Sequence, residues 1–196
     1  MNRRTLLLGA SSFGIIAFAG GSAYITRQRA EETEAAAAAA PAEDDTLLIR
    51  PHSPVLGPLD AKVTLVEFFD PSCEACRAFH PVLKEIRKAF PDDVRIVMRY
   101  AAFHEGSDEA VRILEAVRRQ DLFEPVLDAL LEEQPGWAIH GAPALDVAWE
   151  VAESAGLDME RAQADRLFPG TTAILNQDAD DVQALGVNQT PTFFLN

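Results

Sequence analysis

Cys73 and Cys76 are the residues best suited to chemistry, because they are the only cysteines in the chain and two residues separate them. They follow an apolar run, residues 63–69, whose β-branched and aromatic side chains predict a buried strand. Asp70 and Pro71 end that strand, so Cys73 is expected at the N-terminus of the next helix. Unpaired N–H groups and the helix dipole favour a thiolate there, and a thiolate is the attacking species in disulfide exchange. The spacing therefore predicts an exposed, attacking Cys73 and a deeper, resolving Cys76.

A structural disulfide and a metal site stay open as alternative roles for the cysteine pair. A purely structural disulfide would close a very short loop, so its entropic contribution to stability would be small. A metal site needs about four ligands, and of the four histidines only His80 is on the same predicted helix, four residues after Cys76. The alternative function is therefore a copper or zinc carrier that uses Cys73, Cys76 and His80.

The segments around the cysteines predict an α/β fold. Apolar residues at helical spacing predict a helix over residues 72–90, which contains Pro81 and should be kinked by it. Residues 94–100 predict a second strand. A strand, a helix and a strand at this spacing form a βαβ unit.

Helical patterns then fill most of residues 107–185, and residues 192–195 predict a last strand. Ser107 is expected to cap the first of these helices, and Asp121 is expected to begin the second. A long helical segment therefore separates two parts of a strand-containing domain.

Composition and charge exclude some classes of function. The 196 residues are 48% hydrophobic and 24% charged, which is typical of one globular domain with a core. The formal net charge is −14, and phosphate backbones repel such a surface. We therefore expect no nucleic-acid partner.

Residues 1–29 have the pattern of an export signal or a membrane anchor. Arg3 and Arg4 precede an apolar stretch without charge that extends to residue 25. A stretch of about twenty apolar residues can also span a bilayer, so cleavage and anchoring both stay open. Residues 30–45 contain six consecutive alanines among acidic residues and are expected to be a linker. The folded domain is therefore expected over residues 46–196.

Taken together, these features resemble the thioredoxin superfamily, and within it the exported DsbA-like thiol–disulfide oxidoreductases. The segment VEFFDPSCEAC, residues 66–76, is similar to the family's apolar strand that leads into Cys-x-x-Cys. The segment GVNQTPTFFLN, residues 186–196, is similar to its Gly-Val-x-x-Thr-Pro-Thr-Phe segment. The resemblance implies a thioredoxin-like α/β fold with a DsbA-type helical insertion over about residues 107–170.

The resemblance also implies roles for individual residues. Glu67, six residues before Cys73, occupies the place of the acid that DsbA-like proteins bury beneath the active site. A buried Glu67 would have a raised pKa and could exchange a proton with Cys76. The bond between Thr190 and Pro191 corresponds to the family's cis bond beside the disulfide, where the Thr190 backbone can pair with an extended substrate strand.

The resemblance further implies cofactors, partners and a location. The redox-active disulfide between Cys73 and Cys76 would need neither an organic cofactor nor a metal. The partners would be exported protein substrates and a membrane protein that resets the disulfide. The location would be the periplasm or cell envelope, with attachment to the membrane through residues 1–29 if they are not cleaved.

The sequence departs from the family in two places. Glu74 and Ala75 lie between the cysteines, where the strong oxidases of the family have Pro-His. A carboxylate beside Cys73 should disfavour its thiolate and make the redox couple milder. The sequence also ends at Asn196, so the further strand and helix that usually complete this fold are expected to be missing, which would leave a sheet edge uncovered.

Overall fold

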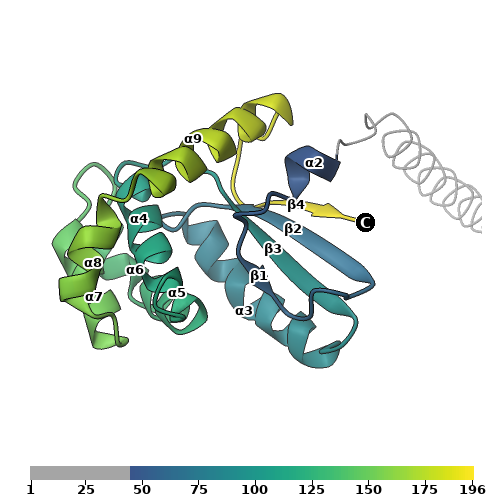
Figure 1. The fold of residues 1–196 in the computed structure, drawn as a ribbon, viewed down its shortest axis with the longest axis horizontal. Coiled ribbons are helices and arrows are strands. Elements are labelled where there is room, and N and C mark those ends of the chain that lie inside the picture. The colour runs from purple at the N-terminus through teal and green to yellow at the C-terminus, as the bar shows by residue number, and fades with distance from the viewer. Residues whose placement is uncertain (1–44) are drawn as a thin grey trace, which may run out of the picture. The chain divides into compact units, whose positions relative to one another are not determined.

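A computed structural model describes residues 45–196 of the chain (Figure 1). The predicted leader, residues 1–29, and the predicted linker up to residue 44 lie outside the described residues. The strands are β1 (Val55–Leu56), β2 (Val63–Phe69), β3 (Val94–Tyr100) and β4 (Thr192–Leu195). The helices are α2 (Asp45–Leu48), α3 (Glu74–Ala89), α4 (Ser107–Arg118), α5 (Phe123–Glu132), α6 (Gln134–Trp137), α7 (Leu145–Ser154), α8 (Met159–Arg166) and α9 (Pro169–Ala184).

The strands form one mixed sheet in the order β1-β3-β2-β4. The central strands β2 and β3 are parallel, from Val63 opposite Val94 to Phe69 opposite Tyr100. The edge strand β1 runs antiparallel to β3, and β4 runs antiparallel to β2. Helix α3 connects the two parallel strands, so the predicted βαβ unit is confirmed, with both strands at the predicted bounds.

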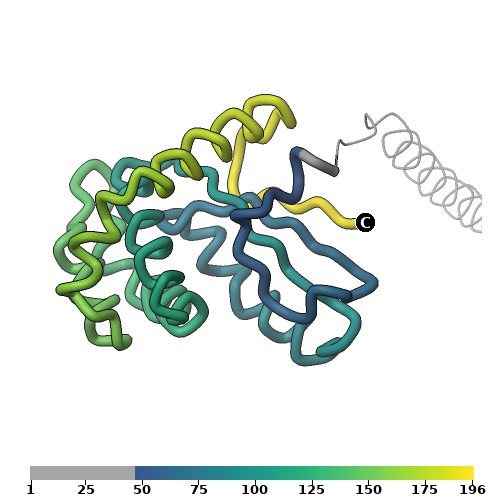
Figure 2. The backbone as a smooth tube through the Cα atoms, in the orientation of Figure 1, coloured from purple at the N-terminus to yellow at the C-terminus, as the bar shows by residue number. Residues whose placement is uncertain are grey.

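Alternate residues of each central strand face opposite sides of the sheet. Phe69 packs in one hydrophobic cluster with Leu83 of α3. Phe68 packs in a second cluster with Val182 of α9. Helix α3 therefore covers one face and α9 the other, as the path of the chain in Figure 2 also shows. Glu67, two residues before Phe69, belongs to the face that α3 covers.

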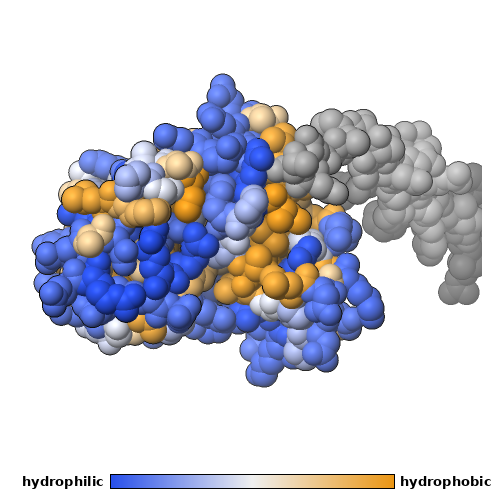
Figure 3. Space-filling view, viewed as in Figure 1, coloured by the Kyte–Doolittle hydropathy of each residue, from blue (hydrophilic) through white to orange (hydrophobic). Residues whose placement is uncertain are grey.

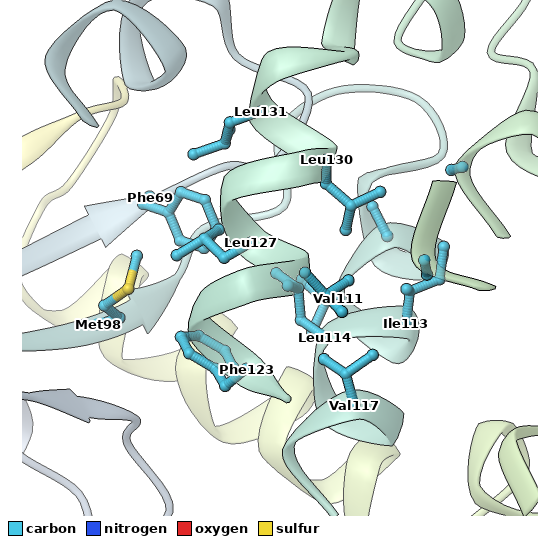
Figure 4. Packing of buried hydrophobic residues seen from close by; sticks show 14 of the residues in the cluster. Phe69, Met98, Val111, Ile113, Leu114, Val117, Phe123, Leu127, Leu130 and Leu131 are labelled. Atoms are coloured by element: carbon cyan, nitrogen blue, oxygen red, sulfur yellow. The ribbon is translucent and has the colours of Figure 1, made fainter. Parts of the chain in front are cut away.

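Helices α4 to α8, which follow β3 and precede α9 in the sequence, form a helical layer. The core of this layer continues into the core of the sheet. In Figure 4, Leu127 of α5 lies between Phe69 of β2 and the α4 residues Val111 and Leu114. The sheet and the helical layer therefore share one hydrophobic core, which is the predicted arrangement of an α/β fold with a helical insertion.

Two predicted helix starts are wrong. Ser107 is the first residue of α4 rather than its cap, and its hydroxyl donates to the Asp70 carboxylate. Asp121 has a left-handed φ of 60° and lies outside α5, which begins at Phe123 without a side-chain cap. Tertiary and turn geometry thus decide where these helices begin. The short elements α2, α6 and β1 have no sequence prediction, because they are too short to show a periodic pattern.

The surface of the helical layer is mostly hydrophilic on the face seen in Figure 3, whereas hydrophobic residues gather over the strands. The hydrophilic residues are in keeping with the net charge of −14. Within residues 45–196, no helix combines the length and the apolar character that crossing a membrane requires.

A buried ion-pair network fastens α9 to the sheet. Arg99 of β3 is fully buried, and its guanidinium donates to the carboxylates of Asp178 and Asp181 on α9. Asp178 also accepts the Tyr100 N–H at 2.8 Å, and the Leu48 carbonyl accepts an Arg99 N–H at 2.9 Å. Because α9 leads directly into the segment before β4, this network also helps to place that segment against β2.

We expect Asp178→Ala to lower the free energy of unfolding by about 3–5 kcal/mol, because it leaves the buried Arg99 guanidinium short of an acceptor. Urea unfolding of the full chain measures this loss. Asp180→Ala is the matched control, since Asp180 is exposed on the same helix, and it should change stability by about 0.5 kcal/mol or less. Equal losses in the two variants would contradict a stabilising role for the network.

Candidate active site

The cysteine pair lies where β2 passes into α3. Cys73 occupies the N-cap of α3 with extended backbone angles, φ −80° and ψ 122°, and Cys76 lies in the first turn. An N-cap residue is usually one whose side-chain oxygen accepts an N–H of the first turn. Here the cap residue carries a sulfur atom instead, so the positive end of the helix dipole acts on the Cys73 side chain.

Both cysteines are free thiols and both are buried, Cys73 at 6% and Cys76 at 1% exposure. Cys76 is the deeper of the two, as predicted, but the expectation of an exposed Cys73 is wrong. The segment before β4 covers this cysteine, since the Cys73 Sγ is 3.3 Å from the carbonyl oxygen of Thr190. The Cys76 Sγ accepts the Asp70 N–H at 3.5 Å.

The second cysteine and the predicted acid influence each other. Glu67 is 2% exposed, and burial raises its pKa from 4.5 to about 8. Burial also raises the pKa of Cys76 well above its usual range, although the hydrogen bond from the Asp70 N–H opposes this rise. The neighbouring Cys73 sulfur and the Glu67 carboxyl raise the Cys76 pKa further. Glu67 is therefore close enough to the Cys76 sulfur for the charge of its carboxylate to act on that thiol, and burial disfavours the charged form of each group.

The pairing of β4 with β2 brings Thr190 and Pro191 to the cysteines. In this antiparallel pair Phe193 lies opposite Glu67, so the residues just before β4 reach the end of β2 where the cysteines begin. The peptide bond between Thr190 and Pro191 is cis. The four residues Cys73, Cys76, Thr190 and Pro191 therefore come together although 114 positions separate Cys76 from Thr190.

Asp70 is a central polar residue of the site that the sequence reasoning did not select. It is fully buried, and one carboxylate oxygen accepts the Ser72 N–H at 2.8 Å and the Ser107 hydroxyl. The other oxygen accepts the N–H groups of Phe103 and His104 at 2.7 and 3.0 Å. One carboxylate thus joins the end of β2, the start of α3 and the start of α4. An Asp-Pro pair after a strand is typical of an ordinary turn, so the sequence carries no signal of this role.

Gln134 of α6 holds the cysteine segment from the helical insertion. Its buried side-chain amide donates to the carbonyl oxygens of Pro71 at 2.8 Å and Cys73 at 3.0 Å. The carbonyls on both sides of Ser72 are therefore fixed by a residue about 60 positions later in the chain. No motif in the sequence marks Gln134.

Glu74, the residue after Cys73, is exposed. Its Oε1 lies 2.7 Å from the Nε2 of His140. A backbone hydrogen bond at the start of α3 and the hydrogen bond with His140 lower the pKa of Glu74. The His140 ring also contacts the ring of His104, with ring centres 5.7 Å apart. The carboxylate beside the attacking cysteine is thus charged, and a histidine from the helical insertion partly offsets it.

The geometry gives no support to the alternative metal site. Across residues 45–196, no three His, Cys, Asp or Glu side chains form a group that could hold a metal ion. His80, the third ligand of that alternative, places its Nε2 2.6 Å from the Asp128 carboxylate.

Comparison with known proteins assigns the chain to a family. The profile of a family described as thioredoxin matches residues 50–196. The chain belongs to this thioredoxin family. Disulfide bond formation protein D of Bacillus subtilis (strain 168) is 31% identical over 154 residues, which are 73% of this chain and 67% of that protein. The Na⁺/H⁺ antiporter NhaA of Herminiimonas arsenicoxydans is 34% identical over 141 residues, 72% of this chain but 22% of that protein. The chain thus spans less than a quarter of that antiporter's length.

Solved structures share the fold. A thioredoxin-like oxidoreductase from Silicibacter pomeroyi DSS-3 is 35% identical, with a TM-score of 0.68 over 79% of this chain and 86% of that one. The α-DsbA1 of Wolbachia pipientis has a TM-score of 0.69 over 78% of each chain at 18% identity, which shows a common fold. The predicted thioredoxin-like α/β fold with a DsbA-type helical insertion is confirmed.

We expect Glu67→Gln to stabilise the reduced protein more strongly as the pH rises from about 5 to about 8. Between 4.5 and about 8 the folded protein keeps a proton on Glu67 that the unfolded chain has lost. The stability of the unaltered protein therefore falls as the pH rises through this window, whereas the glutamine side chain does not titrate. Urea unfolding at both ends of the window measures the difference between the two proteins.

Glu85→Gln is the control for this measurement, because Glu85 of α3 is an exposed glutamate whose carboxyl stays in solvent. The difference in free energy of unfolding between Glu85→Gln and the unaltered protein should barely depend on pH. If Glu67→Gln raised the free energy of unfolding by the same amount from about pH 5 to about pH 8, Glu67 would already be ionised in the folded protein.

We expect Glu74→Gln to raise the rate at which iodoacetamide alkylates Cys73 at mildly acidic pH. Because the Glu74 side chain is exposed and its charge is screened by solvent, removing it favours the Cys73 thiolate by only about 0.5–1 kcal/mol, which is about two- to fivefold in rate. Mass spectrometry of the Cys76→Ala background follows Cys73 alone. His140→Gln should slow the reaction, because the Glu74 carboxylate loses its histidine partner and its negative charge then acts more strongly on Cys73. Glu85→Gln should leave the rate unchanged. Equal rates in all four proteins would exclude an electrostatic effect of Glu74.

Proposed function

We propose that this chain is a thiol–disulfide oxidoreductase that acts on protein thiols and disulfides in the cell envelope. One observation carries the proposal: Cys73 lies at the N-cap of α3 beside the Thr190 carbonyl, with Cys76 and the protonated Glu67 beneath it. This arrangement provides an attacking sulfur, a resolving sulfur and a proton donor in one place. The likeness to a disulfide bond formation protein and to a thioredoxin-like oxidoreductase supports the same reaction.

The first step of substrate oxidation is attack by a substrate thiolate on the Cys73 sulfur of the Cys73–Cys76 disulfide. A bond forms between the substrate sulfur and Cys73, and Cys76 leaves with the electron pair of the broken bond. A charged Cys76 is unfavourable because burial raises its pKa, so it takes up a proton. Glu67, whose pKa of about 8 keeps it protonated near neutral pH, donates that proton.

The second step releases the substrate. A second substrate thiolate attacks the substrate sulfur of the mixed disulfide, and Cys73 leaves as a thiolate at the positive end of the α3 dipole. The substrate then holds a disulfide, and the cysteine pair holds two more electrons than before. A membrane redox partner would remove these electrons and restore the disulfide without an organic cofactor or a metal.

The segment before β4 is proposed to bind the substrate. Its Thr190 backbone lies next to the reacting sulfur, and the cis bond to Pro191 turns the chain into the edge strand β4. An extended peptide can pair with backbone groups at such a place and bring its own cysteine to Cys73. The signal-like pattern of residues 1–29 supports exported proteins as the substrates.

Trapping tests the proposed function directly. We expect the Cys76→Ala variant of the full chain to accumulate mixed disulfides with envelope proteins, because Cys73 still reacts and no second cysteine resolves the product. Non-reducing gels and mass spectrometry identify the trapped proteins. Cys73→Ala is the matched control and should trap none. Adducts of equal abundance in both variants, or in neither, would contradict the assigned roles.

A further inference from the structure

A small cavity adjoins the buried Glu67 carboxyl. Its volume is about 10 Å³, and its polar walls are Glu67, His80, Lys84 and Arg87, while β1 and β3 contribute aliphatic side chains. One water needs a cavity of about 10–15 Å³ and two to four polar partners. The Arg87 Nε adds a buried donor that has no hydrogen-bond partner within residues 45–196. The cavity therefore has the size and the polar groups to hold one water beside Glu67.

His80 connects this cavity to the surface. Its side chain is 11% exposed, and it also lines an outer groove of about 610 Å³ together with Arg77, Pro81 and Asp128. The imidazole thus borders both the cavity beside Glu67 and a groove that is open to solvent, as Lys84 also does. A proton that leaves or reaches Glu67 by this route passes His80.

The contacts of His80 leave one ring nitrogen free to exchange a proton. Its Nε2 is 2.6 Å from one oxygen of Asp128, and Lys84 donates to the other oxygen. Burial acts against ionisation of Asp128, but the hydrogen bonds from His80 and Lys84 outweigh it and hold the pKa of this carboxyl below its usual range. A charged Asp128 fixes the hydrogen of a neutral His80 on Nε2, so Nδ1 remains as the acceptor.

We propose that His80, held by Asp128, relays protons between solvent and Glu67 through one water in the cavity. The proposal rests on the proposed function, because Glu67 needs a new proton only after it has protonated Cys76. In that relay a protonated His80 gives its Nδ1 proton to the water, and the water gives a proton to the Glu67 carboxylate. The neutral ring is then protonated again at Nδ1, the nitrogen that Asp128 leaves free, by solvent from the groove. When the disulfide is restored, the same protons move outward, and no electrons pass through His80.

The other charged residues near the cavity are cations held by acids. Lys84 pairs with Asp128, and the Arg87 guanidinium donates to Glu124 of α5 at 2.6 Å. A guanidinium cannot lose a proton in a protein, so Arg87 does not relay one. Each cation already has an acid as its partner, and it is burial that raises the pKa of Glu67. Arg77, Glu85 and Glu132 also line the outer groove. Their charges act on His80 through solvent, so salt screens their effect on the pH dependence of the rate.

The test is a single turnover of the full chain. The oxidised protein is mixed with a dithiol peptide, and acid quenching at successive times measures the loss of the Cys73–Cys76 disulfide. His80→Gln keeps a hydrogen-bond donor toward Asp128 but cannot carry a proton. We expect its rate near neutral pH to fall about tenfold and its solvent deuterium isotope effect to exceed that of the unaltered protein.

His52→Gln is the matched control. His52 also bonds to an aspartate, Asp178, at 2.7 Å, but it does not line the cavity of Glu67. It should keep the rate and the isotope effect of the unaltered protein. His80→Ala provides a second test, because it opens space between the groove and the cavity. Added imidazole should restore its rate and should not restore that of Glu67→Gln, whereas a purely structural loss would not respond to imidazole.

The outcomes separate the two proposals. A His80→Gln protein with the rate and isotope effect of the unaltered chain across about pH 6–8 would overturn the relay, as would a His80→Ala rate that imidazole leaves unchanged. Failure of the unaltered chain itself to oxidise the peptide would instead overturn the proposed function. The relay is supported when the unaltered chain is active, His80→Gln is slow and imidazole rescues His80→Ala.

Discussion

A carboxyl and a thiol share the apolar space between α3 and the sheet, and neither can be charged there without a large desolvation cost. This shared burial links Glu67 to Cys76, since each raises the cost of ionising the other. In the reduced protein burial therefore favours the neutral form of both groups, a protonated carboxyl and a protonated thiol. The same burial lowers the stability of the protein at pH values above the ordinary pKa of a carboxyl, so the fold carries Glu67 at a thermodynamic cost, and groups with such perturbed pKa values gather at functional sites. The disulfide step is where the proton of the carboxyl is needed, because breaking the bond creates a charge on Cys76.

The attacking cysteine depends on three segments that are far apart in sequence. The Asp70 carboxylate fixes the end of β2 to the start of α4, Gln134 holds the carbonyls around Ser72, and Thr190 reaches Cys73 from the segment before β4. Within the cysteine segment these contacts use the Ser72 N–H, the Pro71 carbonyl and the Cys73 sulfur. The N-cap geometry of Cys73 therefore does not rest on the four residues of the motif alone. The helical insertion contributes to the chemistry by orienting the helix end at which the thiolate forms.

The sequence predicts the parts of the fold whose signals are local and periodic. Strands β2 and β3 have the predicted bounds, because each is a short run rich in β-branched and other apolar residues, with Asp-Pro after β2 and Pro-Asp-Asp before β3. The burial of Glu67 is implied by the resemblance to DsbA-like proteins, through its spacing to Cys73, and not by the pattern of the strand itself. Asp70 and Gln134 could not be found in this way. Their partners are backbone groups that only the folded chain brings near, and nothing in an Asp-Pro turn or a lone glutamine distinguishes a buried anchor from an exposed polar residue. The burial of Cys73 could not be predicted for the same reason, because a segment more than a hundred residues later covers it.

The four histidines show why a partner alone does not define a role. Each bonds to a carboxylate: His52 to Asp178, His80 to Asp128, His104 to Asp70 and His140 to Glu74. In a chain with 31 acidic and 17 basic residues such pairs are common, and each fixes which ring nitrogen carries the hydrogen. What differs is the surroundings of the ring. His104 and His140 face each other at the mouth of the site, and His52 joins the network that holds α9. Among these four, His80 alone lines both the Glu67 cavity and the solvent groove, so an Asp–His pair like those that are structural elsewhere lies here on the proposed proton path.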